Sequence, residues 1–130
     1  MNKQQVEAIL LYYKNIDAEI NLYYLMEQRT KMFYGQELPP EVEAEIQRQR
    51  EQRQRLAALK EEIIAGLEKL ESSTKKIIYY FYILDKKWNE IKRIVHFSTR
   101  SCQNKRDIGI DQLKEIYAGS DTLQKLKEEI

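Results

Sequence analysis

Four glycines and two prolines are the only residues of these two types in a chain of 130 residues. A sandwich or barrel of many short strands needs a turn roughly every 8–12 residues, and Gly and Pro supply many of those turns. The small number of Gly and Pro residues therefore favours long helices over many short strands. The length suits one domain, or one small domain with an extension. We therefore predict an all-α protein.

Residues 2–34 carry the apolar spacing of a helix, with apolar side chains recurring three and four positions apart. Gly35 suits the end of this helix, and the Pro39–Pro40 pair prevents its continuation. A second helix is predicted from Pro40 to Leu70, with acidic residues in its first turn. Two long helices joined by so short a loop should fold back on each other as an antiparallel hairpin.

The middle of the second predicted helix is almost wholly polar, with the run QRQREQRQR at residues 47–55. A solvated helical face is the ordinary interpretation, because Glu51 and the acids that flank the run dilute its positive charge. Contact with nucleic acid is the alternative. For residues 1–71 as a whole we predict a helical hairpin that serves oligomerisation or partner binding.

Apolar residues of the first predicted helix form a heptad-like seam that so polar a neighbour cannot cover completely. Exposed apolar stripes of this kind mark protein–protein interfaces. A symmetric homodimer is the commonest solution, and RNA polymerase is a second candidate partner. The alternative is a monomer in which the C-terminal helices fold back onto the seam. The residues expected at the interface are Val6, Tyr13, Ile20 and Tyr24.

An apolar segment, IIYYFYIL, follows a cluster of hydroxyl residues beyond position 71. The hydroxyl residues at 72–74 offer an N-cap for a helix from Lys75 to about Leu84. A helix that is apolar nearly all round must be buried on several sides. Its aromatic cluster at residues 79–82 is therefore expected in a core or an interface, with a base-stacking platform as the alternative.

A short helix is expected at Trp88–Val95, followed by a turn that ends at Ser98. Ser98 is a strong candidate for the N-cap of a longer helix over residues 99–117. We predict that residues 72–120 form a domain and that residues 121–130 form a short C-terminal helical tail.

Charge is divided unevenly between these parts, although the net charge of the chain is only +1. Residues 1–71 hold 10 basic and 13 acidic residues, a net charge of −3. Residues 72–118 hold 10 basic and 5 acidic residues, a net charge of +5. The excess of positive charge indicates a nucleic-acid face in the C-terminal part.

A short helix, a tight turn and a longer helix with polar first positions have the order of a helix–turn–helix motif. In that motif the second helix lies in the major groove, with its N-terminal side chains at base edges. Arg can read guanine through two hydrogen bonds, and Gln or Asn can pair with adenine. The residues expected to read bases are Thr99, Arg100, Gln103 and Asn104.

Basic side chains around the motif, together with the capped helix N-terminus, are expected to hold phosphate groups. The expected phosphate contacts are Lys86, Lys87, Lys92, Arg93, Ser98, Lys105 and Arg106. Apolar side chains of both helices are expected to fix the angle between them. The expected core residues are Trp88, Ile91, Phe97, Cys102, Ile110 and Leu113.

The run WNEIKRIVHFSTRSC at residues 88–102 resembles the W-E-E-I-A … S-x-x-x-V signature of sigma-factor region 4-type helix–turn–helix domains. The whole chain resembles small phage transcriptional regulators of the ArpU/RinA type, which join a long helical pair to Y-I … W-x-E-I … S … A-L-x-x-L. Tyr82 and Ile83 match the Y-I element. The sequence signals cover residues 56–116, and the N-terminal helices resemble the family by architecture alone.

Three positions depart from the family pattern. Lys92 replaces a small Ala, and Lys105 stands where an apolar residue is common. Gly109 replaces an Ala, which should weaken the helix by about 0.5–1 kcal/mol. The resemblance implies a sigma region 4-like helix–turn–helix domain after the hairpin.

These features predict a sequence-specific protein that binds double-stranded DNA, in the role of a phage or prophage transcriptional regulator. A phage packaging protein of the small-terminase kind is the first alternative, because such proteins also join a DNA-binding domain to oligomerising helices. An interaction protein that inhibits a host nucleic-acid enzyme is the second. Fold likeness alone does not choose among them.

The remaining composition argues against an enzyme. Cys102 is the only cysteine and His96 is the only histidine, which excludes a disulfide within the chain and a cysteine-based zinc site. No Gly-rich phosphate loop is present. The first apolar run is too short and too interrupted for a signal peptide or a membrane span. We therefore expect no catalytic residue, metal or cofactor, no membrane contact and a cytoplasmic location in a bacterial host cell.

Overall fold

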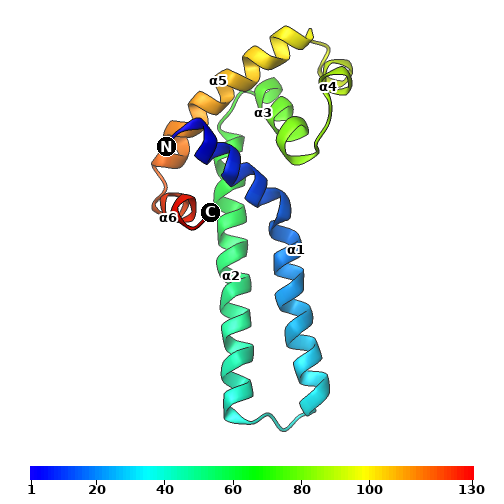
Figure 1. Cartoon of the computed structure of the whole chain (residues 1–130), viewed down its shortest axis with the longest axis vertical. Helices are drawn as coiled ribbons and strands as arrows, with labels where there is room; N and C mark the ends of the chain where they lie inside the picture. The colour runs from blue at the N-terminus through cyan, green and yellow to red at the C-terminus, as the bar shows by residue number, and fades with distance from the viewer. The chain divides into compact units, whose positions relative to one another are not determined.

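The computed structural model describes all 130 residues, and every regular element in it is helical (Figure 1). The all-α prediction is therefore confirmed. Six α-helices and one short π-helix follow one another along the chain. They are α1 (Lys3–Tyr34), α2 (Pro40–Glu68), α3 (Ser72–Ile78), the π-helix η1 (Tyr79–Ile83), α4 (Trp88–Val95), α5 (Thr99–Ala118) and α6 (Asp121–Glu129).

The chain forms two compact units whose boundaries lie inside the two long helices. Unit 1 contains residues 1–14 and 61–130, and unit 2 contains residues 15–60. This division differs from the boundary at residue 71 that we predict from the sequence. The start of α1 and the end of α2 belong with the C-terminal helices, because their apolar side chains help to build the same core.

Unit 2 consists of two antiparallel helical segments, one from α1 and one from α2. Gly35 ends α1 with a φ of +68°, the left-handed conformation that glycine adopts without strain, and its N–H donates to the Lys31 carbonyl at 2.8 Å. Lys60 Nζ lies 2.6 Å from Asp17 Oδ1 and links the two segments far from the loop. The predicted end of the first helix at Gly35 is confirmed.

Every helix of unit 1 contributes buried apolar side chains. α5 packs against α3, α4 and α6. The Tyr117 hydroxyl donates a hydrogen bond of 2.9 Å to the Ile63 carbonyl, so the end of α5 is fixed on α2. Fully buried side chains of this unit include Val6, Ile9, Leu10, Ile63, Ile77, Ile78, Ile91, Cys102, Leu113 and Leu123.

Two glycines set the distances between helices in unit 1. A Cβ at Gly109 would lie 2.4 Å from Ile78 Cδ1 and 2.6 Å from Thr74 Cγ2. A Cβ at Gly66 would lie 2.3 Å from Tyr117 Cε1. Both distances are far inside van der Waals contact, so neither position accepts a side chain without movement. Gly109 does not break α5, which is continuous through it.

The start of the third helix differs from the sequence prediction. α3 begins at Ser72, and its N-cap is Glu71, which makes no side-chain bond to the helix N–H groups. Ser73 and Thr74 already lie in the helix and donate their hydroxyls to the Glu71 carboxylate, at 2.6 and 3.1 Å. The predicted cap among residues 72–74 is wrong, because the hydroxyls of Ser73 and Thr74 bind the Glu71 carboxylate and that of Ser72 makes no hydrogen bond.

The apolar segment after α3 continues as the π-helix η1, which no spacing rule for α-helices would predict. The C-terminal tail is helical as expected, since α6 spans Asp121–Glu129. The Ser120 hydroxyl caps it by accepting a hydrogen bond from the Leu123 N–H at 3.2 Å. Leu123 and Leu126 are buried, so the tail is part of the core of unit 1.

Candidate nucleic-acid interface

A three-residue turn, His96 to Ser98, joins α4 to α5. His96 has a φ of +61°, and its N–H donates to the Lys92 carbonyl at 3.0 Å, which closes the last turn of α4. Ser98 Oγ accepts a hydrogen bond of 3.1 Å from the Ser101 N–H. The predicted N-cap of α5 is therefore confirmed, and α5 begins at the expected residue.

Apolar contacts fix α4 against α3 and α5. Ile77, Ile91 and Cys102 form a fully buried cluster, and Trp88 packs on its edge. The Trp88 ring stacks on Phe81 with ring centres 4.5 Å apart and planes 13° apart. Burial raises the pKa of the Cys102 thiol, against the opposing effect of the Lys105 charge. Ile110 and Leu113, also expected in this core, are buried as well.

Phe97 is the exception among the expected core residues. Its ring is 38% exposed, and the Lys105 amine lies 4.9 Å from the ring centre. The prediction that Phe97 is buried is wrong. The turn reverses the chain by placing His96 in the left-handed conformation, and the cluster beneath is already filled by Trp88 and Val95.

The four residues expected to read bases lie in the first turns of α5. Arg100 and Asn104 are exposed and occupy the same face, four positions apart. Thr99 and Gln103 are half-buried and lie on a neighbouring face. None of the four side chains takes part in an ion pair or a side-chain hydrogen bond within the chain. They are therefore free to contact a ligand.

Three of the expected phosphate contacts have the same freedom. Lys87, Lys92 and Arg93 are exposed and form no ion pair within the chain. Lys87 directly precedes α4, and Lys92 and Arg93 lie in its last turn. Lys86 is half-buried and lies 3.8 Å from Glu90, a long and weak pairing. Two of these basic residues therefore directly precede α4, and two lie in its last turn.

Lys105, Arg106 and Ser98 are instead engaged within the protein. Lys105 Nζ lies 3.3 Å from Glu71 Oε2, and Arg106 Nε lies 3.0 Å from Asp107 Oδ1. The Arg106 guanidinium also covers the Phe81 and Trp88 rings at 5.3 Å from each centre. The Ser98 hydroxyl is used by the cap of α5. Each of these three side chains therefore already has a partner within the chain.

Acidic side chains limit the positive surface to the beginning of α5. Asp107 and Asp111 are exposed on the face that Arg100 and Asn104 begin. Lys114 lies 2.9 Å from Asp111 and neutralises it in part. Positive charge therefore lies at the N-terminal end of α5 and gives way to negative charge about two turns later.

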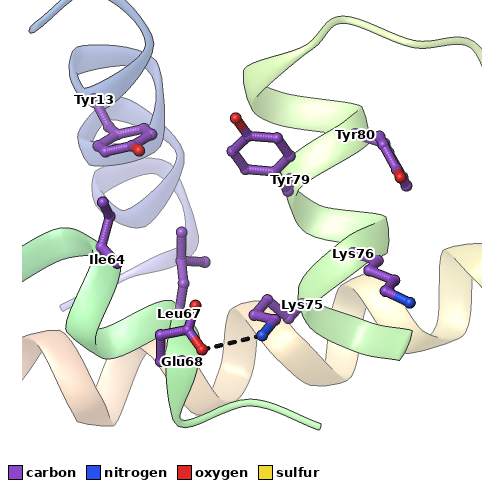
Figure 2. Close-up of a pocket in the computed structure, with 8 residues that line it drawn as sticks. All are labelled: Tyr13, Ile64, Leu67, Glu68, Lys75, Lys76, Tyr79 and Tyr80. Carbon is purple, nitrogen blue, oxygen red and sulfur yellow. Dashed lines mark hydrogen bonds and ion pairs between the residues drawn. The ribbon is translucent and has the colours of Figure 1, made fainter. Parts of the chain in front are cut away.

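A cavity of about 300 Å³ lies elsewhere in unit 1, between α1, α2, α3 and η1. Figure 2 shows the Tyr13 and Tyr79 rings on either side of its opening, with Ile64 and Leu67 below them. The Lys75–Glu68 ion pair, 3.0 Å long, closes one end. None of these residues is among the expected DNA contacts, and Tyr13, expected at a partner interface, is half-buried here.

The expected partner seam on α1 is mostly covered. Val6 is fully buried in unit 1, which excludes it from any surface, because it packs with the C-terminal helices. Ile20 is half-buried, whereas Tyr24 is 45% exposed and carries the Arg53 guanidinium 5.3 Å from its ring centre. Most of the exposed apolar side chains of α1 lie on another face of the helix. The seven-residue spacing of the buried seam gives no sign of that face. Its largest side chains are Leu22, Leu25, Met26, Met32 and Phe33.

A buried carboxylate in unit 2 escaped the sequence analysis. Glu27 is almost fully buried and is bonded by Arg50 and, at 3.2 Å, by Arg53. Burial alone would raise the pKa of Glu27, but the hydrogen bond from Arg50 and the charges of Arg50, Lys31 and Arg53 outweigh it and lower that pKa. The arginines of QRQREQRQR therefore include two that bind an acid of the neighbouring helix.

Comparison with known proteins finds no relative, since no protein-family model, curated protein or solved structure matches the chain. No helix has both the length and the apolar content needed to cross a bilayer.

Proposed function

We propose that this protein binds double-stranded DNA in a sequence-specific manner, with the N-terminal turns of α5 in the major groove. The observation that carries the proposal is a set of four exposed basic side chains without intramolecular partners. They lie in or directly before two helices, α4 and α5, which are joined by a tight, capped turn. The four are Lys87, Lys92, Arg93 and Arg100.

The proposed division of roles follows from exposure. Arg100 has the fork of donors that reads guanine, and Asn104, one turn later on the same face, can pair with adenine. Lys92 and Arg93 at the end of α4 lie where the first helix of such a motif meets the phosphate backbone. The acids Asp107 and Asp111 would repel phosphate, so only the beginning of α5 is expected to enter the groove.

Selection of bound duplexes from a random pool tests sequence specificity directly. We expect one enriched motif, and enrichment of none would refute sequence-specific binding. On the enriched site, Arg100→Ala should weaken binding by about 1–3 kcal/mol and relax the preference at one base pair. Arg100→Lys should lose most of that preference as well, because Lys lacks the fork. An equal loss on random duplexes would make Arg100 a phosphate contact.

The salt dependence of binding tests the phosphate contacts. Lys92→Ala and Arg93→Ala should each reduce the salt slope by about 1, because each removes one contact that releases counterions. Lys105→Ala should leave the slope unchanged, since its amine is held by Glu71 and Phe97. Lys125→Ala, an exposed lysine on α6, is the matched control. A slope that changes with Lys105 and not with Lys92 would place the DNA elsewhere.

The biological role we propose is transcription regulation in a phage or prophage, supported by the resemblance of residues 88–102 to region 4 of sigma factors. A regulator should bind a site within a promoter region and change transcription from it. Ring formation near a packaging site would favour the small-terminase alternative. Tight protein binding with little DNA affinity would favour the inhibitor alternative.

A further inference from the structure

We propose that the outward face of α1 in unit 2 binds a second copy of this chain, with the two α1 helices antiparallel about a two-fold axis near residue 24. The proposal does not depend on DNA binding. It rests on the pattern of apolar and charged side chains along residues 18–33 of a single helix.

Apolar side chains in this segment point outward. Leu22 and Leu25 are 56% and 53% exposed, and Met32 and Phe33 are 85% and 82% exposed. With Met26 they recur at the three- and four-residue spacings of one helical face. The opposite face, toward α2, buries the charged Glu27. This helix exposes its apolar face to water and buries a charged side chain toward α2. Such a pattern is typical of a surface that binds a partner.

Two charged residues, Glu19 at one edge of this face and Arg29 within it, favour one kind of occupant. Glu19 and Arg29 are exposed, and neither takes part in an ion pair within the chain. They have opposite sign and lie ten residues apart, or about 15 Å along the helix axis. Residue 24 is halfway between them, and Leu22, Leu25 and Met26 surround that point. The apolar centre therefore has one negative and one positive end.

A surface of this kind is complementary to itself. In an antiparallel pair of helices with the axis at residue 24, Glu19 of each copy faces Arg29 of the other. The same register places Leu22 of one copy against Met26 of the other, whereas Met32 and Phe33 fall opposite residues 16 and 15, outside this apolar contact. In a two-fold interface, if residue i of one copy contacts residue j of the other, residue j of the first copy also contacts residue i of the second. A different partner would have to supply the same arrangement by chance, so a second copy is the occupant that the charges favour.

Sedimentation of the full-length chain without DNA tests the proposal, over a range of micromolar concentrations. We expect a dimer. Glu19→Arg and Arg29→Glu should each raise the dissociation constant about tenfold, because each turns two attractive pairs into two repulsive ones. The double variant with both substitutions restores opposite charges and should dimerise like the original chain. Glu61→Arg, an exposed and unpaired glutamate outside this face, is the matched control.

Two outcomes would overturn the proposal. One is an original chain that stays monomeric at these concentrations. The other is a dimer that single charge reversals leave unchanged, or that the double variant fails to restore. Leu25→Asp should abolish the dimer by placing a charge at its centre, and the far-ultraviolet spectrum of each variant checks that it remains helical. Because no DNA is present, failure of this proposal and failure of the proposed DNA binding are read separately.

Discussion

Gly109 shows how one missing side chain sets the separation of two helices. From the sequence it resembles a weak point in α5, and in the structure it is where α5 approaches α3 most closely. The absent Cβ leaves room for the ends of Ile78 and Thr74. The helix tolerates the glycine because both of its neighbours in space are buried against it.

We expect Gly109→Ala to lower the free energy of unfolding by about 1–3 kcal/mol, although Ala is the better helix former. Chemical denaturation measures the change. Gly119→Ala is the matched control, since a Cβ there meets nothing closer than the Ile116 carbonyl oxygen at 3.4 Å. It should change stability by less than about 0.5 kcal/mol. Equal effects at the two positions would contradict the close packing of α3 on α5.

A second residue-scale prediction concerns the acid at the start of α3. Hydrogen bonds from Ser73 and Thr74, and then the bond and charge of Lys105, lower the pKa of Glu71 to about 2 from an ordinary value of 4.5. The folded pKa lies below the unfolded one, so the stabilisation is complete above about pH 4.5 and is lost as the pH falls toward 2.

Carbon-detected NMR titration of the Glu71 carboxyl measures this directly. We expect it to remain ionised below pH 3.5, where exposed glutamates are already protonated. Ser73→Ala should move its midpoint back toward the ordinary value, because the first of its hydrogen bonds is lost. A midpoint near 4.5 in the unaltered protein would show that these hydroxyls do not bind the carboxylate.

At the scale of elements, local patterns predict helices well and their packing partners poorly. Ser98 marks the start of α5, and Gly35 marks the end of α1, because a cap or a left-handed turn depends on nearby residues alone. The start of α3 is missed because its hydroxyls bind Glu71. The engagement of Arg106 is missed because stacking on Phe81 and Trp88 depends on tertiary neighbours.

The two serines at helix starts make this difference measurable. Ser98→Ala should lower the free energy of unfolding by about 1 kcal/mol, because it removes the bond to the Ser101 N–H. Ser72→Ala should have almost no effect, since Ser72 lies inside α3 and makes no side-chain hydrogen bond. Thermal unfolding of both variants measures the two losses of stability. A larger loss at Ser72 would restore it as the cap of α3.

At the scale of the whole molecule, the candidate DNA-binding helices do not form a unit by themselves. Residues 1–14 complete the core of unit 1, with Val6, Ile9 and Leu10 fully buried. The Tyr82 hydroxyl donates to the Glu7 carboxylate at 2.9 Å, and Lys14 pairs with Asp85. Such long-range contacts leave no periodic signal, so the sequence suggests a boundary at residue 71, whereas the compact units divide within α1 and α2.

We therefore expect a substitution near the start of the chain to destabilise α5 as well. Ile9→Ala should cost about 2–5 kcal/mol and accelerate hydrogen exchange of the α5 amides as well as those of its own helix. Leu11→Ala is the matched control, because Leu11 is mostly exposed two positions away. Faster exchange confined to residues 3–14 would instead show that this segment is only loosely attached to unit 1.

The discontinuous core of unit 1 also affects how the chain is made. Ribosomes add roughly 5–20 residues per second, so the segment 61–130 takes about 4–14 s to appear after residue 60. Throughout that interval Val6, Ile9 and Leu10 lack most of the residues that they pack against, whereas the residues of unit 2 are close together in sequence. The nascent protein therefore exposes an apolar N-terminal segment until the rest of unit 1 has been made.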